Sequence, residues 1–372
     1  MNHNDRTKNF KIEHIDPMGQ GVSKIGDKII FIPKTLPGEE GLCEVLQSKK
    51  GVEFAKLSSI ELPSPDRVRA ECPHFEDCPS CHYLHTSYAN ELLHKKNAIQ
   101  KELRPITIQG EIEVIPADTR FDYRNRIQLH YDLNEEKIGY IDVKNKRINE
   151  VPHCLLPQKI IQEKVKSLYQ NKFKGFPQKR ETGHIEIYVN SKTNRVETAF
   201  NKAYAHAGFT QVNFEMNEKA LSLIHSYVAP KINKTSLVID LFGGKGNLSR
   251  AFSTSNTYVV DKYHPKYIPK NDIQKFINLD IFKKKSHKNL AKQVGGECDV
   301  LLIDPPRSGF KNIKLFTDVL KPKVIVYMSC KTSTMVRDLL SIDNEYHFHK
   351  AHLLDFFPAT YHYESLIFAN FK

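Results

Sequence analysis

Four short segments of this chain carry residue types that could form a reactive site. Cys330 follows the apolar run 324–329, which is typical of a buried strand. Many α/β enzymes place reactive side chains at this point, just beyond the carboxyl edge of a parallel sheet. A lone cysteine is usually an inert buried residue, so three companions strengthen the case. They are Asp304-Pro-Pro-Arg307, a glycine-rich segment at 240–246, and His362-Tyr-Glu364.

The glycine-rich segment is typical of a turn that holds a nucleotide-like cofactor. It follows the apolar run 237–239 and precedes a helix that we expect to begin near Asn247. Glycines let the backbone turn tightly and approach a ligand without a Cβ atom in the way. No Ser or Thr follows Lys245, which argues against a phosphate-binding P-loop, and Ser249 stands where a nicotinamide loop would have its third glycine. A turn with only a packing role is the alternative.

Three carboxylates further along could complete this site. Asp261 ends the next apolar run, about 20 residues after the loop, where a carboxylate can hold ribose hydroxyls. Asp280 is expected after the third strand and could reach an adenine ring. Asp304 closes the fourth expected strand, and the two prolines behind it stiffen the loop that would present it to a planar base.

A second group of cysteines predicts a metal site. Cys72, Cys78 and Cys81 lie close together in the sequence, and Cys154 stands alone. Seven cysteines in a chain that we expect to be cytoplasmic point to metal binding or catalysis rather than to disulfides. The spacing alone allows zinc or an iron–sulfur cluster and slightly favours zinc. Four unrelated buried thiols are the alternative.

The elements that would position these residues change in kind along the chain. Residues 10–61 contain short β-type runs broken by Gly and Pro, which suggest a small barrel, and Pro63-Ser-Pro65 suggests a linker. A helix is predicted from about Ser87, as its N-cap, to Leu103. Alternating apolar and polar residues at 126–133 and 185–189 predict half-buried strands in an irregular, β-rich middle region.

From about residue 205, expected strands and helices alternate, which indicates a doubly wound α/β domain. The candidate strands are 236–242, 257–261, 300–303, 323–328, 345–353 and 364–369. We therefore expect three domains, a barrel over 1–61, a β-rich domain over 62–204 and an α/β domain over 205–372. A chain of 372 residues is long enough for two or three cores.

The composition limits the possible partners. Lys and Arg number 55 against 43 Asp and Glu, a net charge of +12, which fits a nucleic acid but also fits a basic protein without one. The polar amino terminus lacks a secretory signal, and no apolar run approaches the ~18 residues that a membrane span needs. These features predict a cytoplasmic protein that does not cross a membrane.

Together the motifs resemble those of the 5-methyluridine RNA methyltransferases over nearly the whole chain. The family's glycine motif is matched by Asp240, Leu241, Phe242, Gly244 and Gly246, and its Phe-x-Gln-x-Asn element by Phe209, Gln211 and Asn213. Asp304-Pro-Pro-Arg307, Ser329-Cys330 and the Phe357–Glu364 segment follow in the family's order. The resemblance implies a C-terminal Rossmann-like S-adenosylmethionine methyltransferase domain, an N-terminal OB-like barrel of the TRAM type, and a central β-rich domain.

The resemblance also implies a role for each candidate. Cys330 would add as a thiolate to carbon 6 of uracil, because carbon 5 alone is a poor nucleophile towards a methylsulfonium. Glu364 would then remove the proton from carbon 5, and Asp304 would contact the uracil or the cofactor. Apart from the resemblance, the charge of Lys331, the next residue in the sequence, is expected to lower the pKa of Cys330. The expected cofactor-binding residues are Gln211, Asp240, Phe242, Gly244, Gly246, Asp261, Asp280 and Asp304.

For the cysteines, the resemblance reverses the preference for zinc. Family members with this spacing carry a 4Fe-4S cluster, here to be held by Cys72, Cys78, Cys81 and Cys154. Arg124 and Arg126 match a Tyr-Arg-Asn-Arg element of the family and are candidate RNA contacts, with a solvated strand face as the alternative.

Some positions depart from the family's pattern. Gly243 stands where Cys is usual, and Lys245 replaces a small or apolar residue. Lys331-Thr332 replaces Asn-Pro after the catalytic Cys, and Pro79-Ser80 replaces Gly-Gly between two cluster ligands. These changes affect the cofactor loop and the choice of substrate, and they leave the nucleophile and the base in place.

We therefore predict a monomeric enzyme that uses S-adenosylmethionine to methylate carbon 5 of a uridine in structured RNA. The substrate is expected to be 23S rRNA, because both the barrel and the cysteine group are present. Methylation of a tRNA T-loop is the alternative within the class. A catalytically quiet RNA-binding or chaperone protein is the alternative outside it, although binding alone would require neither Cys330 nor Glu364.

Overall fold

The computed structural model describes residues 6–142, 146–171, 174–177, 180–190, 193–204, 210–252, 256–262 and 274–372. Phe209, the first residue of the Phe-x-Gln-x-Asn element, lies outside them. The chain divides into two compact units. Unit 1 contains Met1–Ala98, Asp118–Tyr204 and Phe357–His362, and unit 2 contains Ile99–Ala117, Ala205–Phe356 and Tyr363–Lys372. The division into domains over 1–61, 62–204 and 205–372 stays a prediction.

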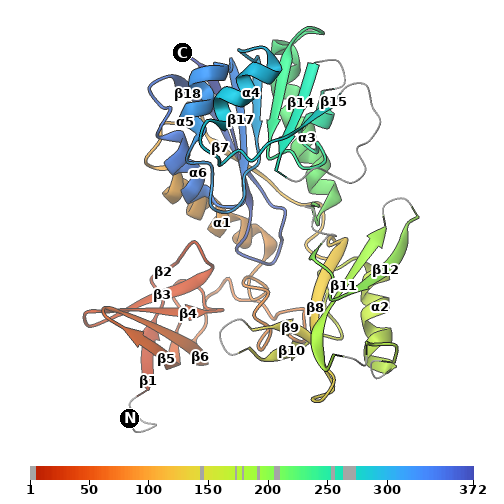
Figure 1. The fold of residues 1–372 in the computed structure, drawn as a ribbon. Coiled ribbons are helices and arrows are strands. Elements are labelled where there is room, and N and C mark those ends of the chain that lie inside the picture. The colour runs from red at the N-terminus through yellow and green to blue at the C-terminus, as the bar shows by residue number, and fades with distance from the viewer. Residues whose placement is uncertain are drawn as a thin grey trace. The chain divides into compact units, whose positions relative to one another are not determined.

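The amino-terminal part of unit 1 forms a six-stranded sheet in the order β1-β5-β6-β4-β3-β2 (Figure 1). Neighbouring strands are antiparallel except for the parallel pair β4 and β6. Its core contains Phe10, Ile12, Ile30, Ile32 and Cys43. The short apolar segments that were predicted to be strands therefore share one hydrophobic core. The strands are β1 Thr7–Lys11, β2 His14–Ile15, β3 Gln20–Ile25, β4 Lys28–Pro33, β5 Glu40–Lys49 and β6 Val52–Leu62.

The second part of unit 1 is a five-stranded sheet in the order β10-β9-β8-β11-β12. Residues on β8 alternate between buried and partly buried positions, as predicted for a half-buried strand. On β11 the residues 185–189 are all buried, so the prediction of a half-buried strand is wrong there. The helix predicted from Ser87 is also confirmed, since the Ser87 hydroxyl accepts a hydrogen bond from the Asn90 amide at 3.2 Å. The elements are α1 Tyr88–Leu103, β8 Arg126–Asp132, β9 Lys137–Ile141, β10 Ile148–Glu150, α2 Lys159–Gln170, β11 Thr182–Asn190 and β12 Arg195–Phe200.

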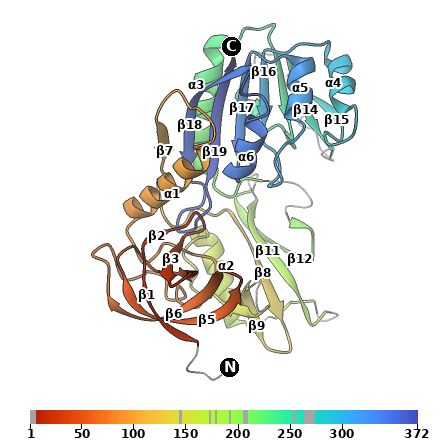
Figure 2. The same cartoon turned by 90° about the vertical axis from the view of Figure 1, so that its left-hand side faces the viewer.

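Unit 2 contains an eight-stranded sheet in the order β15-β14-β13-β16-β17-β19-β18-β7 (Figures 1 and 2). The five strands from β15 to β17 are parallel, and β19 runs antiparallel between β17 and β18. The strands are β7 Ile112–Ile115, β13 Leu237–Leu241, β14 Asn256–Asp261, β15 Gln274–Asn278, β16 Val300–Ile303, β17 Val324–Ser329, β18 Tyr346–Leu354 and β19 Glu364–Phe371.

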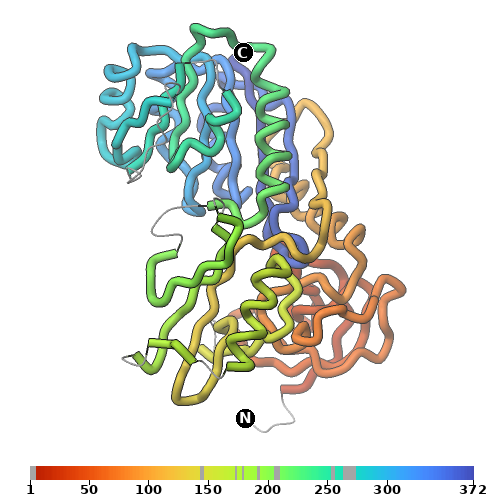
Figure 3. Tube along the Cα trace, turned by 90° about the vertical axis from the view of Figure 1, so that its right-hand side faces the viewer, coloured from red at the N-terminus to blue at the C-terminus, as the bar shows by residue number. Residues whose placement is uncertain are grey.

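Helices alternate with the strands from β15 to β18, and Figure 3 shows a further helix, the segment 214–228, as a green coil. The helices are α3 Phe214–Val228, α4 Ser286–Val294, α5 Ile313–Leu320 and α6 Thr332–Leu339, with short 3-10 turns at Ala229–Lys231 and Ser249–Ala251. The predicted α/β alternation is confirmed from β15 to β18, but the helix expected near Asn247 is wrong for the described residues. Only the 3-10 turn follows the glycine loop there, because the side chain and amide of Ser249 turn back to Asp240. Within the described residues, no helix combines the length and apolar character that crossing a bilayer requires.

Candidate active site

The candidate residues of unit 2 gather at one edge of its sheet. Parallel strands present their carboxyl ends at the same edge, and an antiparallel neighbour begins there. Accordingly, Asp304 follows β16, Cys330 follows β17, and Glu364 is the first residue of the antiparallel β19. Asp240, Asp261 and Asp280 stand at or just beyond the ends of β13, β14 and β15.

The strand register explains why Cys330 and Glu364 are neighbours. Ser329, the last residue of β17, pairs with Ser365 of β19. One step further along the same antiparallel register brings Cys330 opposite Glu364. Glu364 is buried, with 4% exposure, and its Oε2 atom accepts no hydrogen bond from the described residues. A buried carboxylate oxygen of this kind is open to a ligand, because an unpaired buried polar atom costs free energy.

Burial raises the pKa of the Cys330 thiol to about 11, and the carboxyl groups of Glu364 and Asp304 add to this shift. The guanidinium of Arg307 opposes it through its charge and a hydrogen bond to the thiol. The cation beside the thiol is therefore Arg307, which corrects the expectation for Lys331. The charge of Lys331 acts instead on Glu102.

The two carboxyl groups next to the thiol are also shifted. Burial raises the pKa of Asp304 to about 7, with a contribution from Asp240. Burial and the charge of Asp304 raise the pKa of Glu364 well above its ordinary value, while Arg307 opposes that shift. Two carboxyls whose pKa values are raised, beside a thiol, can give and take protons during a reaction.

The glycine loop between β13 and β14 is held in a tight conformation. Phe242, Gly244 and Gly246 have φ values of 61°, 54° and 79°, and the left-handed conformation suits glycine best. A Cβ atom on Gly243 would lie 2.7 Å from Val259 Cγ1 and 2.8 Å from Asp240 Cγ. The absence of a side chain at 243 thus matches the close packing of this loop.

Two aspartates accept hydrogen bonds from the glycine loop or from the turn that follows it. Burial raises the pKa of Asp240 to about 7, and its Oδ2 atom accepts hydrogen bonds from the Ser249 hydroxyl at 2.6 Å and amide at 3.2 Å. Its Oδ1 atom is buried and receives no hydrogen bond from the described residues. Asp261 accepts a hydrogen bond from the Gly244 amide at 3.0 Å, so the acid at the end of β14 does face the loop.

The remaining predicted cofactor residues lie near the same edge or serve the fold. Asp280 contacts Lys262 at 3.4 Å and accepts a hydrogen bond from the Phe282 amide at 3.2 Å. Gln211 is buried, and Asn213 caps α3 by accepting a hydrogen bond from the Met216 amide. Phe242 packs against Phe310 and Phe282, with ring centres 5.1 and 5.5 Å apart.

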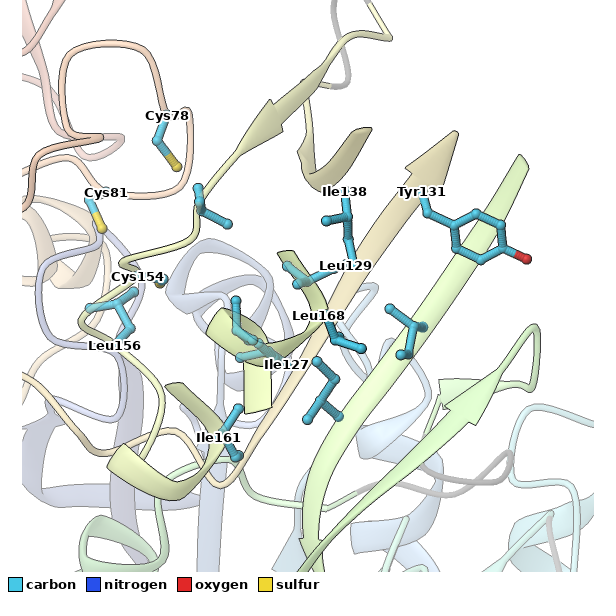
Figure 4. Packing of buried hydrophobic residues seen from close by; sticks show 14 of the residues in the cluster. Cys78, Cys81, Ile127, Leu129, Tyr131, Ile138, Cys154, Leu156, Ile161 and Leu168 are labelled. Carbon is cyan, nitrogen blue, oxygen red and sulfur yellow. The ribbon is translucent and has the colours of Figure 1, made fainter. Parts of the chain in front are cut away.

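In unit 1, the four predicted cluster cysteines line one cavity together with His74 and Tyr140. Figure 4 shows Cys78, Cys81 and Cys154 at one end of a hydrophobic cluster. The thiols also shift one another's pKa. Burial raises the pKa of Cys81, and the neighbouring thiols of Cys154 and Cys78 raise it further. Among the described residues, however, no group of three or more His, Cys, Asp or Glu side chains is arranged to hold a metal ion.

The structure gives the two candidate RNA-contacting arginines intramolecular partners. Arg126 contacts Glu186 at 2.6 Å with only 11% of its side chain exposed, and its guanidinium lies 4.3 Å from the ring centre of Tyr188. Arg124 donates a hydrogen bond to the Tyr123 hydroxyl at 3.2 Å. Burial raises the pKa of Cys154 to about 11, and the charge of Arg124 opposes that shift, so this arginine lies beside the cysteine cavity.

Sequence reasoning missed two features of this site. Arg307 belongs to a quoted motif, but its contact with the thiol depends on the packing of neighbouring loops. A cation three residues after a candidate acid was the signal available. Ser249 was noted only at the position of a missing glycine. A hydroxyl nine positions after an aspartate near the end of a buried strand was the available signal for their hydrogen bond.

The chain is similar to known proteins over part or nearly all of its length. Residues 282–371 match the family described as tRNA (Uracil-5-)-methyltransferase. The chain is 26% identical to the 23S rRNA (uracil(1939)-C(5))-methyltransferase RlmD of Shewanella sediminis, over 96% of this chain and 94% of the relative. It is 25% identical to the protein of that name from Vibrio campbellii, over 98% of this chain and 96% of the relative.

A solved structure shows the same fold. It is the Pyrococcus abyssi tRNA (uracil-54, C5)-methyltransferase in complex with S-adenosyl-L-homocysteine, with a TM-score of 0.73 at 18% identity. The match covers 97% of this chain and 100% of that one. With the family match over residues 282–371 and the full-length relatives, the chain is similar to the RNA 5-methyluridine methyltransferases.

Proposed function

We propose that this enzyme methylates carbon 5 of a uridine in 23S rRNA, with S-adenosylmethionine as the methyl donor. The observation that carries the proposal is the meeting of Cys330, Glu364 and Asp304 at one sheet edge, where each thiol or carboxyl shifts the pKa of another. The relatives named as 23S rRNA methyltransferases span nearly the whole chain, which favours ribosomal RNA as the substrate.

In the proposed reaction, the Cys330 thiol loses its proton and adds to carbon 6 of the uracil. This addition makes carbon 5 electron-rich, so that it can take the methyl group. When bound, S-adenosylmethionine would supply that group from its positively charged sulfur, with S-adenosylhomocysteine as the leaving group. Glu364 then accepts the proton from carbon 5, and the double bond re-forms as the Cys330 sulfur leaves. Arg307 favours the thiolate in the first and last steps.

The glycine loop and its aspartates would hold the methyl donor. The unpartnered Oδ1 atom of buried Asp240 and the left-handed backbone at Gly244 and Gly246 fit a ligand that approaches the main chain closely. Asp261 and Asp280 would bind the ribose and the adenine, and Gln211 and Phe242 would border the donor. Asp304 would contact the uracil or the donor near the reacting atoms.

For the cysteine cavity of unit 1, we propose a 4Fe-4S cluster held by Cys72, Cys78, Cys81 and Cys154. Four thiols around one cavity are the donor set that such a cluster takes. The resemblance of the cysteine spacing to that of cluster-carrying family members favours this cluster over a zinc ion. The cluster would bind the segment 72–81 to Cys154, which lies far along the chain.

The amino-terminal sheet of residues 7–62 would act as the TRAM-type RNA-binding module, and the residues up to 204 would form the central RNA-binding domain. Arg124 and Arg126 would take part in RNA binding only after giving up or sharing the partners described above. Because both arginines are engaged inside unit 1, we expect them to support the shape of the RNA-binding surface.

The experiment that tests this function compares two RNAs directly. The purified enzyme receives labelled S-adenosylmethionine with either 23S rRNA or tRNA that lacks 5-methyluridine, and the modified nucleotide is mapped. Methylation of the 23S rRNA alone supports the proposal. Methylation of tRNA alone would replace the substrate with the T-loop alternative, to which the Pyrococcus fold relative belongs.

Two variants separate catalysis from binding alone. Cys330→Ala is expected to bind RNA with unchanged affinity and to transfer no methyl group. Glu364→Gln is expected to methylate once and then remain attached to the RNA, because an amide cannot accept the carbon-5 proton; the complex should survive denaturing electrophoresis. A protein with no methyl transfer to either RNA would instead be the catalytically quiet binding protein.

A further inference from the structure

A buried hydroxyl pair links the two loops that carry the reacting groups of unit 2. Thr332 is the first residue of α6, two positions after Cys330, and Ser365 directly follows Glu364 in β19. Their hydroxyl groups share a hydrogen bond of 2.6 Å. Both side chains are buried, with 3% and 0% exposure, so water does not compete for this bond.

The same residues belong to a larger network around Cys330 and Glu364. The Thr332 hydroxyl also lies 3.4 Å from the Tyr363 hydroxyl, and Tyr363 donates to Glu102 of α1 at 3.4 Å. On the other side of the thiol, the Ser329 hydroxyl accepts a hydrogen bond from the Lys331 amide at 3.1 Å. Side-chain hydrogen bonds therefore hold the chain on both sides of Cys330.

These contacts form a short path from the thiol to the carboxyl group. It runs along the backbone from Cys330 to Thr332, crosses to Ser365 through the hydroxyl pair, and ends at Glu364. The β17–β19 pairing ends at Ser329 and Ser365, so Cys330 lies one residue beyond the last paired position, between β17 and α6. The hydroxyl pair is the side-chain link in the described residues that joins the stretch after the thiol directly to the stretch after the carboxyl.

We propose that Thr332 and Ser365 are positioning residues that fix the separation between the Cys330 sulfur and the Glu364 carboxyl. This inference rests on the proposed function, in which the two groups act on adjacent atoms of one uracil ring. Carbon 6 receives the sulfur and carbon 5 loses its proton, so both groups must reach one small ring in the same complex. A shift of about 1 Å between such groups can lower a rate by up to about a hundredfold.

The test compares Thr332→Val, which keeps the shape and removes the hydroxyl, with Thr332→Ser, which keeps the hydroxyl. Thr332→Val is expected to lower kcat roughly tenfold while the Kd for RNA and the KM for S-adenosylmethionine stay within about twofold of wild type. Thr332→Ser should restore most of the rate. Since Thr332→Val and Ser365→Ala remove the same bond, the double variant should lose no more than either single one.

Thr317→Val is the matched control. Thr317 is also buried in unit 2, with 2% exposure, but its hydroxyl donates to the Lys314 carbonyl of its own helix. It should lower the melting temperature about as much as Thr332→Val and leave kcat unchanged. A Thr332→Val enzyme with wild-type kcat, or additive losses in the double variant, would overturn this inference alone. A wild-type protein without methyl transfer would overturn the proposed function, and this inference with it.

Discussion

Cys330 lies among groups of opposite charge, and their balance sets how readily its thiol ionises. Burial, Glu364 and Asp304 all favour the protonated thiol, whereas Arg307 favours the thiolate. The same burial keeps protons on Asp304 and Glu364 to higher pH than usual. The resting site therefore holds its reactive group in the unreactive form, and Arg307 is the residue that limits this effect.

Replacing Arg307 with Gln is expected to move the reactivity of Cys330 to higher pH. The sign follows from the charge: the guanidinium stabilises the thiolate, so its removal raises the pKa of the thiol further above about 11. The thiolate fraction then falls at every pH below that value. Because Arg307 is exposed and solvent screens its charge, we expect the loss in alkylation rate at pH 8 to be about tenfold or less.

The measurement is the rate of Cys330 alkylation by iodoacetamide between pH 7 and pH 10, read by mass spectrometry of the peptide. Arg307→Lys keeps a positive charge and is expected to lie between the wild type and Arg307→Gln. If the Gln variant reacts as fast as the wild type across this range, Arg307 does not control the thiol.

Among the elements, the strands of unit 2 could be predicted closely from the sequence. The apolar run 300–303 is β16 without change, and 323–328 became Val324–Ser329, because buried parallel strands have continuous apolar sequences. The position of β7 could not be predicted. Ile112–Ile115 joins the sheet beside β18, far along the chain, and its four residues carry no signal for that pairing.

The candidate site divides in the same way. Cys330 and Asp304 lie at the same edge of the sheet because each follows a parallel strand. The alternation of strands and helices in the sequence predicts such parallel strands. That Glu364 stands opposite Cys330 depends on the antiparallel insertion of β19 between β17 and β18, which neither the strand patterns nor the resemblance predicted. The Thr332–Ser365 bond needed the register itself, since it joins side chains 33 positions apart.

The departure at Gly243 has a local explanation in the loop that follows β13. A Cβ atom at 243 would lie 2.8 Å from the Asp240 carboxyl carbon. The hydrogen bonds from Ser249 hold that carboxyl in place. In this chain, therefore, the glycine at 243 leaves room for the Asp240 carboxyl, and the serine at 249 holds that carboxyl by hydrogen bonds.

On helix α1, Glu91 is expected to be the residue whose loss destabilises unit 1 most. Its carboxylate contacts Lys95 at 2.7 Å and Arg120 at 2.9 Å and accepts a hydrogen bond from the Ala359 amide at 2.7 Å. Lys95 is only 1% exposed, so Glu91→Ala would leave a buried cation without this partner. Such losses cost about 3–5 kcal/mol of unfolding free energy, measurable by urea denaturation.

Glu218→Ala provides the control, because the pair of Glu218 with Arg250 is exposed on both sides. Exposed pairs contribute about 0–1 kcal/mol, so this variant should unfold at nearly the wild-type urea concentration. Equal midpoints for Glu91→Ala and Glu218→Ala would show that the buried network does not stabilise unit 1.

For the whole molecule, the two units carry different kinds of chemistry on separate scaffolds. Unit 2 positions its reacting groups with hydrogen-bonded strands, and its sheet is continuous from β15 to β7. The cysteine region of unit 1 has little regular structure between residues 63 and 87, where turns connect Cys72, Cys78 and Cys81. Chain segments of this kind gain most from a bound cluster, because the metal replaces missing backbone hydrogen bonds and packing.

The iron–sulfur proposal therefore predicts that loss of one ligand affects unit 1 more than unit 2. Protein purified without oxygen should be brown and contain about four iron atoms per chain. Cys154→Ser should lose the colour and the iron, and its unit 1 should become sensitive to protease, because binding to the folded state alone stabilises that state. Binding of S-adenosylmethionine by unit 2 should change little, since none of its candidate residues lies in unit 1.

Cys43→Ser is the matched control for this prediction. Cys43 is a buried thiol of unit 1 that packs in the core of the amino-terminal sheet rather than lining the cavity. Its replacement should retain the iron, even if the protein becomes less stable. Stoichiometric zinc in the wild type, or equal iron contents in Cys154→Ser and Cys43→Ser, would contradict a cluster at these four cysteines. Either result would leave the reacting groups of unit 2 unaffected, because they depend on the strand register and not on the cluster.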